Sequence, residues 1–122
     1  MKGFFAVCAT LALLMPTLAL ATGKVSEAKL GKSVVNREVG GETSVFAPGE
    51  MAYLWMKVYD ATGETLTVTW EINGQHYPAK LKIGGSPWRT WASKTVHIAG
   101  EWTVTVTDAA GATLSASKFA VK

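Results

Sequence analysis

The residues best suited to molecular recognition lie in segment 86–95, which reads SPWRTWASKT. Trp88 and Trp91 flank Arg89 there, and Lys94 follows. Indole rings present large apolar faces, whereas a guanidinium binds carboxylates and phosphates in two-point geometry. We therefore take Trp88, Arg89, Trp91 and Lys94 as the candidate binding residues. The structural interpretation is the favoured one: the two indoles fill the core, with the guanidinium packed on one of them as a cation–π pair, because a small domain without a disulfide needs the area that tryptophan buries.

Groups that act in catalysis are present, but their spacing brings no catalytic set together. Glu71, Glu101 and Asp108 lie beside strand ends, whereas a glycosidase needs two carboxyl groups converging on one bond. The serines and threonines near His97 have neither a nucleophile elbow nor an orienting acid. We therefore expect no catalytic residues, and an enzyme is the least favoured hypothesis.

Metal and cofactor sites are not expected either. His76 and His97 lie far apart in the sequence, and Met51 and Met56 fall on opposite faces of one strand. Copper sites instead cluster imidazole and sulfur ligands. Gly84-Gly85 precedes no helix, so no phosphate-binding loop of the helix N-terminal kind is expected.

The first 21 residues have the pattern of a secretory signal peptide. Lys2 precedes an apolar run over 4–15, and Ala19-Leu20-Ala21 supplies the small residues of a cleavage site. The run is shorter than the about 20 residues that span a bilayer, which argues against the alternative of an uncleaved anchor. We therefore predict a signal peptide at 1–21 and one exported domain at 22–122, periplasmic or secreted, with no integral membrane segment.

The charge of the chain excludes one class of partner. It holds 12 Lys and Arg residues against 9 Asp and Glu residues, and these are interspersed. Nucleic-acid binding needs a concentrated basic surface, so no nucleic-acid partner is expected. The single cysteine, Cys8, lies in the predicted signal peptide, so the exported domain must be held together by packing without a disulfide.

Period-two alternation of apolar and polar residues predicts strands along the exported domain and no helix. The clearest strand, 66–72, ends at Asn73-Gly74, the strongest short signal for a hairpin. Pro78 makes the returning strand, 75–83, an expected edge strand. About seven strands with turns between them predict an all-β, antiparallel immunoglobulin-like β-sandwich, and a small barrel is the alternative. The predicted strands cover 28–38, 51–59, 66–72, 75–83, 94–98, 101–107 and 114–121.

Two motifs carry a family resemblance: the segment from Trp88 through Lys94 to Thr95, and Gly100-Glu101-Trp102 with the two residues that follow. With them the chain resembles the bacterial domain of unknown function family 2914. The resemblance extends over the exported domain, including Asn36-Arg37-Glu38, although Val39 and Val68 stand where the pattern has proline and often histidine. It implies an exported or membrane-tethered accessory domain.

These observations together favour a non-catalytic binding or accessory module of the bacterial cell envelope. We expect a protein partner, contacted through loops or through the strand edge at 75–83. The alternative is carbohydrate or peptidoglycan binding through Trp88 and Trp91. A flat, exposed pair of indoles favours a glycan, and an open strand edge favours a protein.

Overall fold

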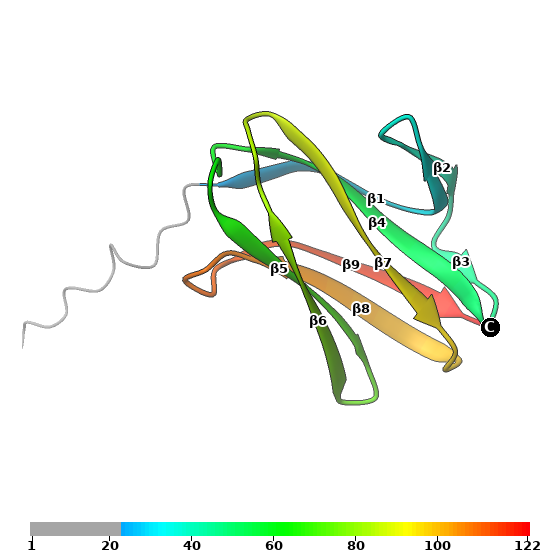
Figure 1. Ribbon diagram of the computed structural model, residues 1–122. Coiled ribbons are helices and arrows are strands. Elements are labelled where there is room, and N and C mark those ends of the chain that lie inside the picture. Colours follow the sequence, from blue (N-terminus) through cyan, green and yellow to red (C-terminus); the bar gives the residue numbers. More distant parts are fainter. Residues whose placement is uncertain (1–22) are drawn as a thin grey trace, which may run out of the picture.

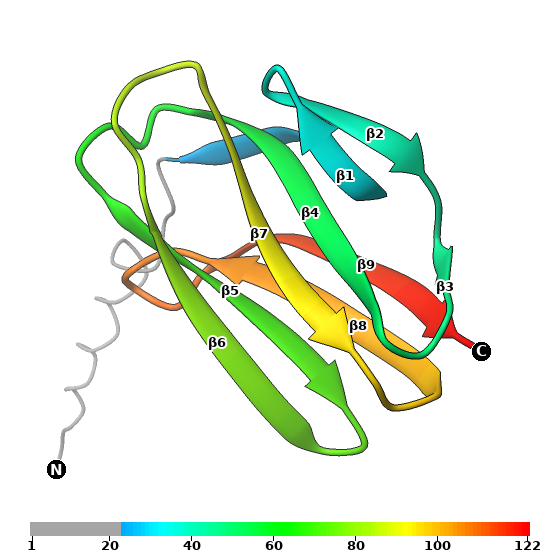
Figure 2. The same ribbon diagram turned by 45° about the vertical axis from the view of Figure 1, so that its right-hand side comes forward.

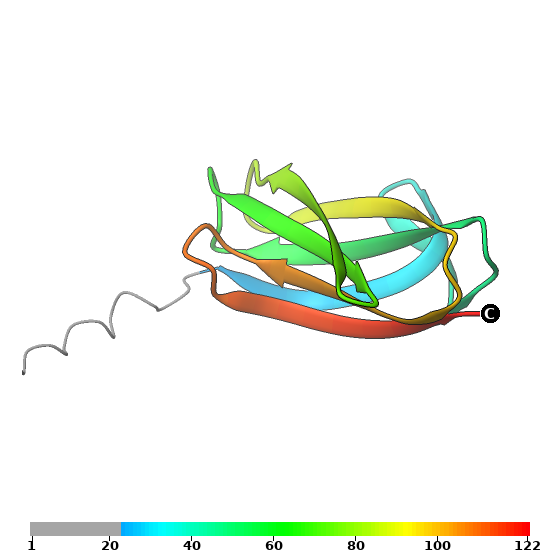
Figure 3. The same ribbon diagram turned by 90° about the horizontal axis from the view of Figure 1, so that it is seen from below.

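The computed structural model describes residues 23–122, which form nine strands in two packed sheets (Figure 1; Figure 3). The four-stranded sheet has the order β2-β1-β4-β7, and the five-stranded sheet has the order β3-β9-β8-β5-β6. The predicted all-β sandwich of immunoglobulin-like type is confirmed, whereas the predicted signal peptide lies outside the described residues. The strands are β1 (Lys24–Val35), β2 (Glu38–Glu42), β3 (Val45–Phe46), β4 (Glu50–Tyr59), β5 (Thr65–Ile72), β6 (Gln75–Lys82), β7 (Trp88–Val96), β8 (Gly100–Thr107) and β9 (Thr113–Val121).

Alternation along each strand creates the core between the two sheets. On β5, Leu66, Val68, Trp70 and Ile72 all point inward and are at most 2% exposed. The residues between them, such as Thr67, lie on the outer face and are half-buried. Because successive side chains of a strand point to opposite faces, this pattern directs one apolar row into the sandwich.

Each strand of the five-stranded sheet contributes one aromatic ring to a continuous row of contacts. Phe46 (β3) meets Phe119 (β9) edge-on at 5.4 Å between ring centroids, and Phe119 stacks on Trp102 (β8) at 5.9 Å. Trp70 (β5) also meets Phe119 edge-on, and Tyr77 (β6) stacks on Trp102 at 6.2 Å. Such pairs add about 0.5–1.5 kcal/mol each beyond the area they bury.

The prediction of one strand over 28–38 is wrong at its end. The chain reverses at Asn36 and Arg37, with φ angles of 53° and 62°, and then starts β2. Two consecutive residues at positive φ are the requirement of a tight hairpin turn whose twist matches its strands. Asn-Arg is not the usual Asn-Gly sequence for such a turn, so the sequence signal was weak.

Two further strands were also not predicted as they occur. β3 pairs with β9 in parallel, so the five-stranded sheet is antiparallel except for this short pair. β7 begins at Trp88 rather than at Lys94, so the tryptophan segment is itself a strand. This second difference determines which way each candidate binding residue points.

The two sheets end in neighbouring edge strands, β6 and β7 (Figure 2). The predicted edge position of the strand that contains Pro78 is therefore confirmed. Lys94 of β7 places its Nζ 4.2 Å from the ring centroid of Tyr77 on β6 and so bridges the two edges.

Among the residues described, none forms a helix long and apolar enough to cross a bilayer.

The carboxylate of Asp108 holds the loop between β8 and β9 together. Its Oδ1 accepts hydrogen bonds from the backbone N–H groups of Ala110 (3.0 Å) and Ala112 (2.8 Å). Asp108→Ala leaves both amides without this acceptor and should lower the free energy of unfolding by about 1–3 kcal/mol. Denaturant titration measures the loss, and the exposed Glu101→Ala change should stay within about 0.5 kcal/mol. Equal stability of the Asp108 variant and the native protein would contradict this assignment.

Glu50 makes stability depend on pH at the turn before β4. Its Oε1 accepts a hydrogen bond from the Ala47 N–H (2.7 Å), and its Oε2 lies 3.4 Å from Lys32 Nζ. The Ala47 hydrogen bond, opposed by desolvation and aided by Lys32, holds the pKa of Glu50 below its ordinary value. Because the pKa is lower in the folded state, the stabilisation is complete above the unfolded-state pKa and is lost as the pH falls through the folded-state pKa.

A comparison with Glu50→Gln tests this linkage. The native protein should melt at a higher temperature than the variant at neutral pH, and the difference should shrink as the pH falls below the ordinary carboxyl value of 4.5. Thermal unfolding over a pH series measures it. A difference that stayed constant with pH would mean that the carboxylate charge at Glu50 contributes nothing.

Candidate functional site

The pairing of β7 with β4 fixes the direction of every side chain in the tryptophan segment. The register runs without interruption from Val58 opposite Trp88 to Glu50 opposite Val96. Trp88 packs against the core, and Ala92 and Val96 are buried, whereas Trp91 is 37% exposed. Trp88 and Trp91 are an odd number of residues apart in one strand, so they lie on opposite faces of the sheet.

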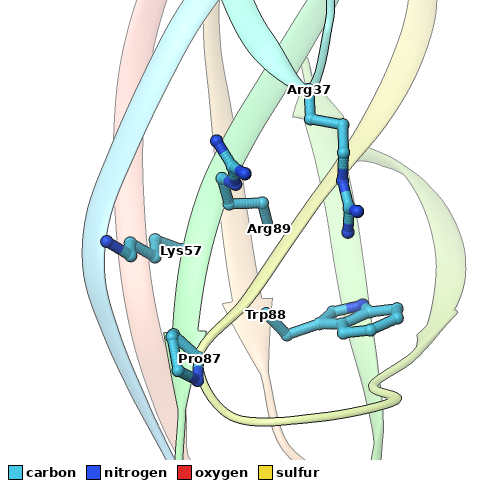
Figure 4. Close-up of a pocket in the computed structure, with 5 residues that line it drawn as sticks. All are labelled: Arg37, Lys57, Pro87, Trp88 and Arg89. Atoms are coloured by element: carbon cyan, nitrogen blue, oxygen red, sulfur yellow. The ribbon is translucent and has the colours of Figure 1, made fainter.

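Trp88 is half-buried between two parts of the chain. A Cβ built on Gly84 would lie 2.8 Å from its Cη2 atom, so this close contact requires glycine. On the other side, the Arg37 guanidinium lies 5.7 Å from the ring centroid of Trp88. Figure 4 shows Arg37 extending from the β1–β2 turn toward this ring. The Trp88 indole is therefore packed between Gly84 and Arg37 and does not present a free flat ring face to solvent.

Arg89 points to the other face of β7 and meets two charged neighbours. Its Nη1 donates a hydrogen bond to Oε2 of Glu38, the residue after the β1–β2 turn. Lys57 of β4 stands directly opposite Arg89 in the register. Lys57 also places its Nζ 5.8 Å from the Tyr59 ring centroid. Two cations directly opposite each other in an antiparallel pair destabilise the sheet.

These residues enclose a pocket of about 560 Å³ at the start of β7, lined by Arg37, Lys57, Pro87, Trp88 and Arg89 (Figure 4). We call it the basic pocket. Trp88 and Arg89 were predicted from the sequence as candidate binding residues, whereas the other three lining residues were not. No spacing signal connects them: the ion pair between Glu38 and Arg89 spans 51 positions of the sequence. Only the fold brings the β1–β2 turn to the start of β7.

Trp91 belongs to a different surface, the outer face of the four-stranded sheet. Its cross-strand partner, Trp55, is 2% exposed, because its Nε1–H donates to the Arg37 carbonyl oxygen (2.9 Å) and the β1–β2 turn covers it. Met51 is 43% exposed and Tyr53 is half-buried on the same face of β4. We call Met51, Tyr53 and Trp91 the Trp91 patch.

Lys94 lies apart from the other candidates, over the Tyr77 ring at the gap between the sheet edges. Of the four candidate residues, only Trp88 and Arg89 therefore line one pocket.

The groups considered for catalysis and metal binding lie in ordinary surroundings. Glu71 and His76 form an exposed contact of 3.8 Å, and Asp108 serves the β8–β9 loop. Met56 is fully buried, whereas Met51 is exposed, as expected for residues on opposite faces. Within residues 23–122, no three His, Cys, Asp or Glu side chains are grouped so that they could hold a metal ion.

The unequal exposure of the tryptophans predicts their fluorescence. Trp55, Trp70 and Trp102 are at most 2% exposed, so acrylamide should reach mainly Trp91. Trp91→Phe should therefore remove most of the quenchable emission, and Trp88→Phe, the matched change, should remove less. Stern–Volmer titration with acrylamide measures both variants. A larger loss from Trp88→Phe would contradict the assignment of the two indoles to opposite faces.

Comparison with solved structures supports the fold alone. The chain is 16% identical to the Pseudomonas fluorescens alkylpurine DNA glycosylase AlkC, solved bound to DNA that contains an abasic site analog, with a TM-score of 0.51. The match covers 87% of this chain but only 32% of the glycosylase chain. A Niemann-Pick type C2 protein from the Japanese carpenter ant matches at 12% identity and a TM-score of 0.48, over 84% of this chain and 94% of that one. No curated protein matches the chain.

A family model does match part of the sequence. The match covers residues 63–121, which include the tryptophan–arginine segment and Gly100-Glu101-Trp102, and leaves Asn36-Arg37-Glu38 outside. The resemblance drawn from these motifs is therefore confirmed for the second half of the chain. Over residues 63–121 this chain is similar to the family described as "Protein of unknown function (DUF2914)".

Proposed function

We propose that this protein is a non-catalytic binding module of the bacterial cell envelope, and that a protein partner docks on the Trp91 patch. The observation that carries the proposal is the exposure of Trp91 beside Met51 and Tyr53 on the outer face of the four-stranded sheet. Tryptophan, tyrosine, methionine and arginine are the side chains enriched at protein interfaces. A partly exposed indole among such residues is a typical anchor for a partner.

The surroundings of the patch support a protein as the partner. β7 pairs with β4 on one side only, so its other edge is the end of the sheet. A partner on the outer face can therefore extend past this edge, and Arg89, two residues before Trp91 on the same face of β7, offers a charged rim. A polar or charged rim around an apolar centre is the usual anatomy of an interface.

Carbohydrate or peptidoglycan binding is the second candidate, and the geometry weakens its main support. A glycan platform made of Trp88 and Trp91 needs both indoles on one face. The two rings lie on opposite faces, and Trp88 is covered by Arg37 and by Gly84. One exposed indole remains, which a glycan binder would share with a protein interface.

Photo-crosslinking in the producing bacterium tests the proposal. A benzophenone-bearing amino acid in place of Tyr53 should give a discrete protein adduct, and the same group in place of Lys118, exposed on β9 of the other sheet, should not. Trp91→Ala should abolish the Tyr53 adduct, because loss of an anchoring tryptophan costs at least about 2 kcal/mol of binding.

Two outcomes would overturn the proposal. Identical adducts from positions 53 and 118 would show contact without specificity. An adduct that contains glycan and no second polypeptide would favour the carbohydrate alternative instead. The melting temperature of Trp91→Ala, measured alongside, separates a lost contact from a lost fold.

A further inference from the structure

We propose that the basic pocket binds a phosphate monoester carried on a small organic body such as a sugar. The phosphate lies with Lys57 and Arg89, and the organic body lies against Pro87 and the accessible part of Trp88, beside Arg37. This site adjoins the Trp91 patch through Arg89, and its ligand is a small anion rather than a docked protein.

The lining of the basic pocket carries positive charge. Three cationic side chains line the pocket: Arg37, Lys57 and Arg89. Carboxylates nearby include Glu38, paired with Arg89, and Glu27, opposite Lys57 in the register of β1 and β4. The pocket lining itself holds three cations and no carboxylate. Arg89 uses one N–H group on Glu38, and a guanidinium has five, so it can bind a further anion.

The fold holds these cations in energetically unfavourable positions. Lys57 and Arg89 face each other directly across two antiparallel strands, where like charges repel. Arg37 adopts a φ of 62°, which costs energy for a residue with a side chain. Departures of this kind from local preference concentrate at functional sites. An anion bound between Lys57 and Arg89 would be attracted by both cations and would offset the repulsion between them.

The arrangement of the cations favours a phosphate over a carboxylate as the bound anion. A protein carboxylate already occupies one side of Arg89, and the pair Lys57–Arg89 still presents two cations from two strands. A phosphate monoester carries a charge of about −1.5 to −2 at neutral pH and three acceptor oxygens, so it can satisfy both cations at once. The pocket supplies side-chain cations and uses no helix N-terminus, in agreement with the absence of a phosphate-binding loop.

The basic pocket is large enough for a small organic molecule. The pocket volume of about 560 Å³ lies within the range typical of small-molecule sites and far exceeds a single ion. Figure 4 shows Arg89 and, farther from β7, Lys57 of β4 on one side of the β7 start, and the Trp88 ring with Arg37 on the other. A ligand that reaches both needs a body beyond its phosphate. A sugar ring offers apolar C–H groups to Pro87 and Trp88 and hydroxyl acceptors to Arg37.

Titration of the purified protein with four probes tests the proposal: glucose 6-phosphate, inorganic phosphate, glucuronate and glucose. Chemical-shift changes at backbone amides report both affinity and place. Glucose 6-phosphate should bind saturably, with its largest shifts at 37, 57 and 87–89, and more tightly than the other three. Lys57→Gln should weaken it at least about tenfold, as expected for loss of one charge-assisted hydrogen bond. Lys118→Gln, which removes a cation on the other sheet, should leave it unchanged.

The variants also separate the two halves of the site. Arg37→Ala should weaken glucose 6-phosphate more than inorganic phosphate, because Arg37 contacts the organic body. Lys57→Gln removes the repulsion from Arg89 together with the attraction of Glu27, so the melting temperature should stay close to the native value.

Three results would overturn the proposal. The first is saturable binding of none of the probes. The second is equal affinity for inorganic phosphate or for glucuronate, which would remove the organic body or the phosphate from the assignment. The third is equal weakening by Lys57→Gln and Lys118→Gln, which would indicate non-specific attraction to positive charge.

Discussion

The structure depends on the row of aromatic contacts across the inner face of the five-stranded sheet. The only cysteine lies outside residues 23–122, so no disulfide joins the two layers there. Phe119 contacts Phe46, Trp70 and Trp102, and Tyr77 extends the row to the edge strand β6. The Lys94 ammonium packs on Tyr77 from the opposite sheet and closes the end of the row. Side-chain packing therefore stabilises the two layers here, a role that disulfides have in many small secreted domains.

The β1–β2 turn connects this core to the outer surface. The Arg37 carbonyl oxygen accepts the Trp55 indole N–H, its guanidinium lies over Trp88, and the adjacent Glu38 pairs with Arg89. Three successive contacts therefore anchor one tight turn on β4 and β7. A cation placed on such a turn has little freedom, so a ligand that it binds would meet a preorganised site with a small entropic cost.

Sequence patterns predicted the parts of the fold that depend on neighbours along the chain. The strand at 66–72 and the Asn73-Gly74 turn follow from local alternation and from residues that tolerate positive φ. The turn at Asn36-Arg37 was missed because its second residue is an arginine at positive φ rather than the usual glycine, and a hydrogen bond from the distant Trp55 to the Arg37 carbonyl oxygen holds it in place. The basic pocket was missed for a related reason, since Arg37, Lys57 and Arg89 come from three separate segments and meet only through sheet order.

The tryptophan segment shows how strand geometry resolves the choice between scaffold and surface. In a loop, Trp88 and Trp91 would be free to face one ligand together, whereas in a strand their odd spacing forces them apart. Trp88 accordingly fills the space between Gly84 and Arg37, and Trp91 faces solvent beside buried Trp55. The structural hypothesis fits Trp88, whereas the exposed Trp91 stays a candidate for binding. Arg89, between them, stands where the wall of the basic pocket meets the exposed face, so one side chain contributes to both surfaces.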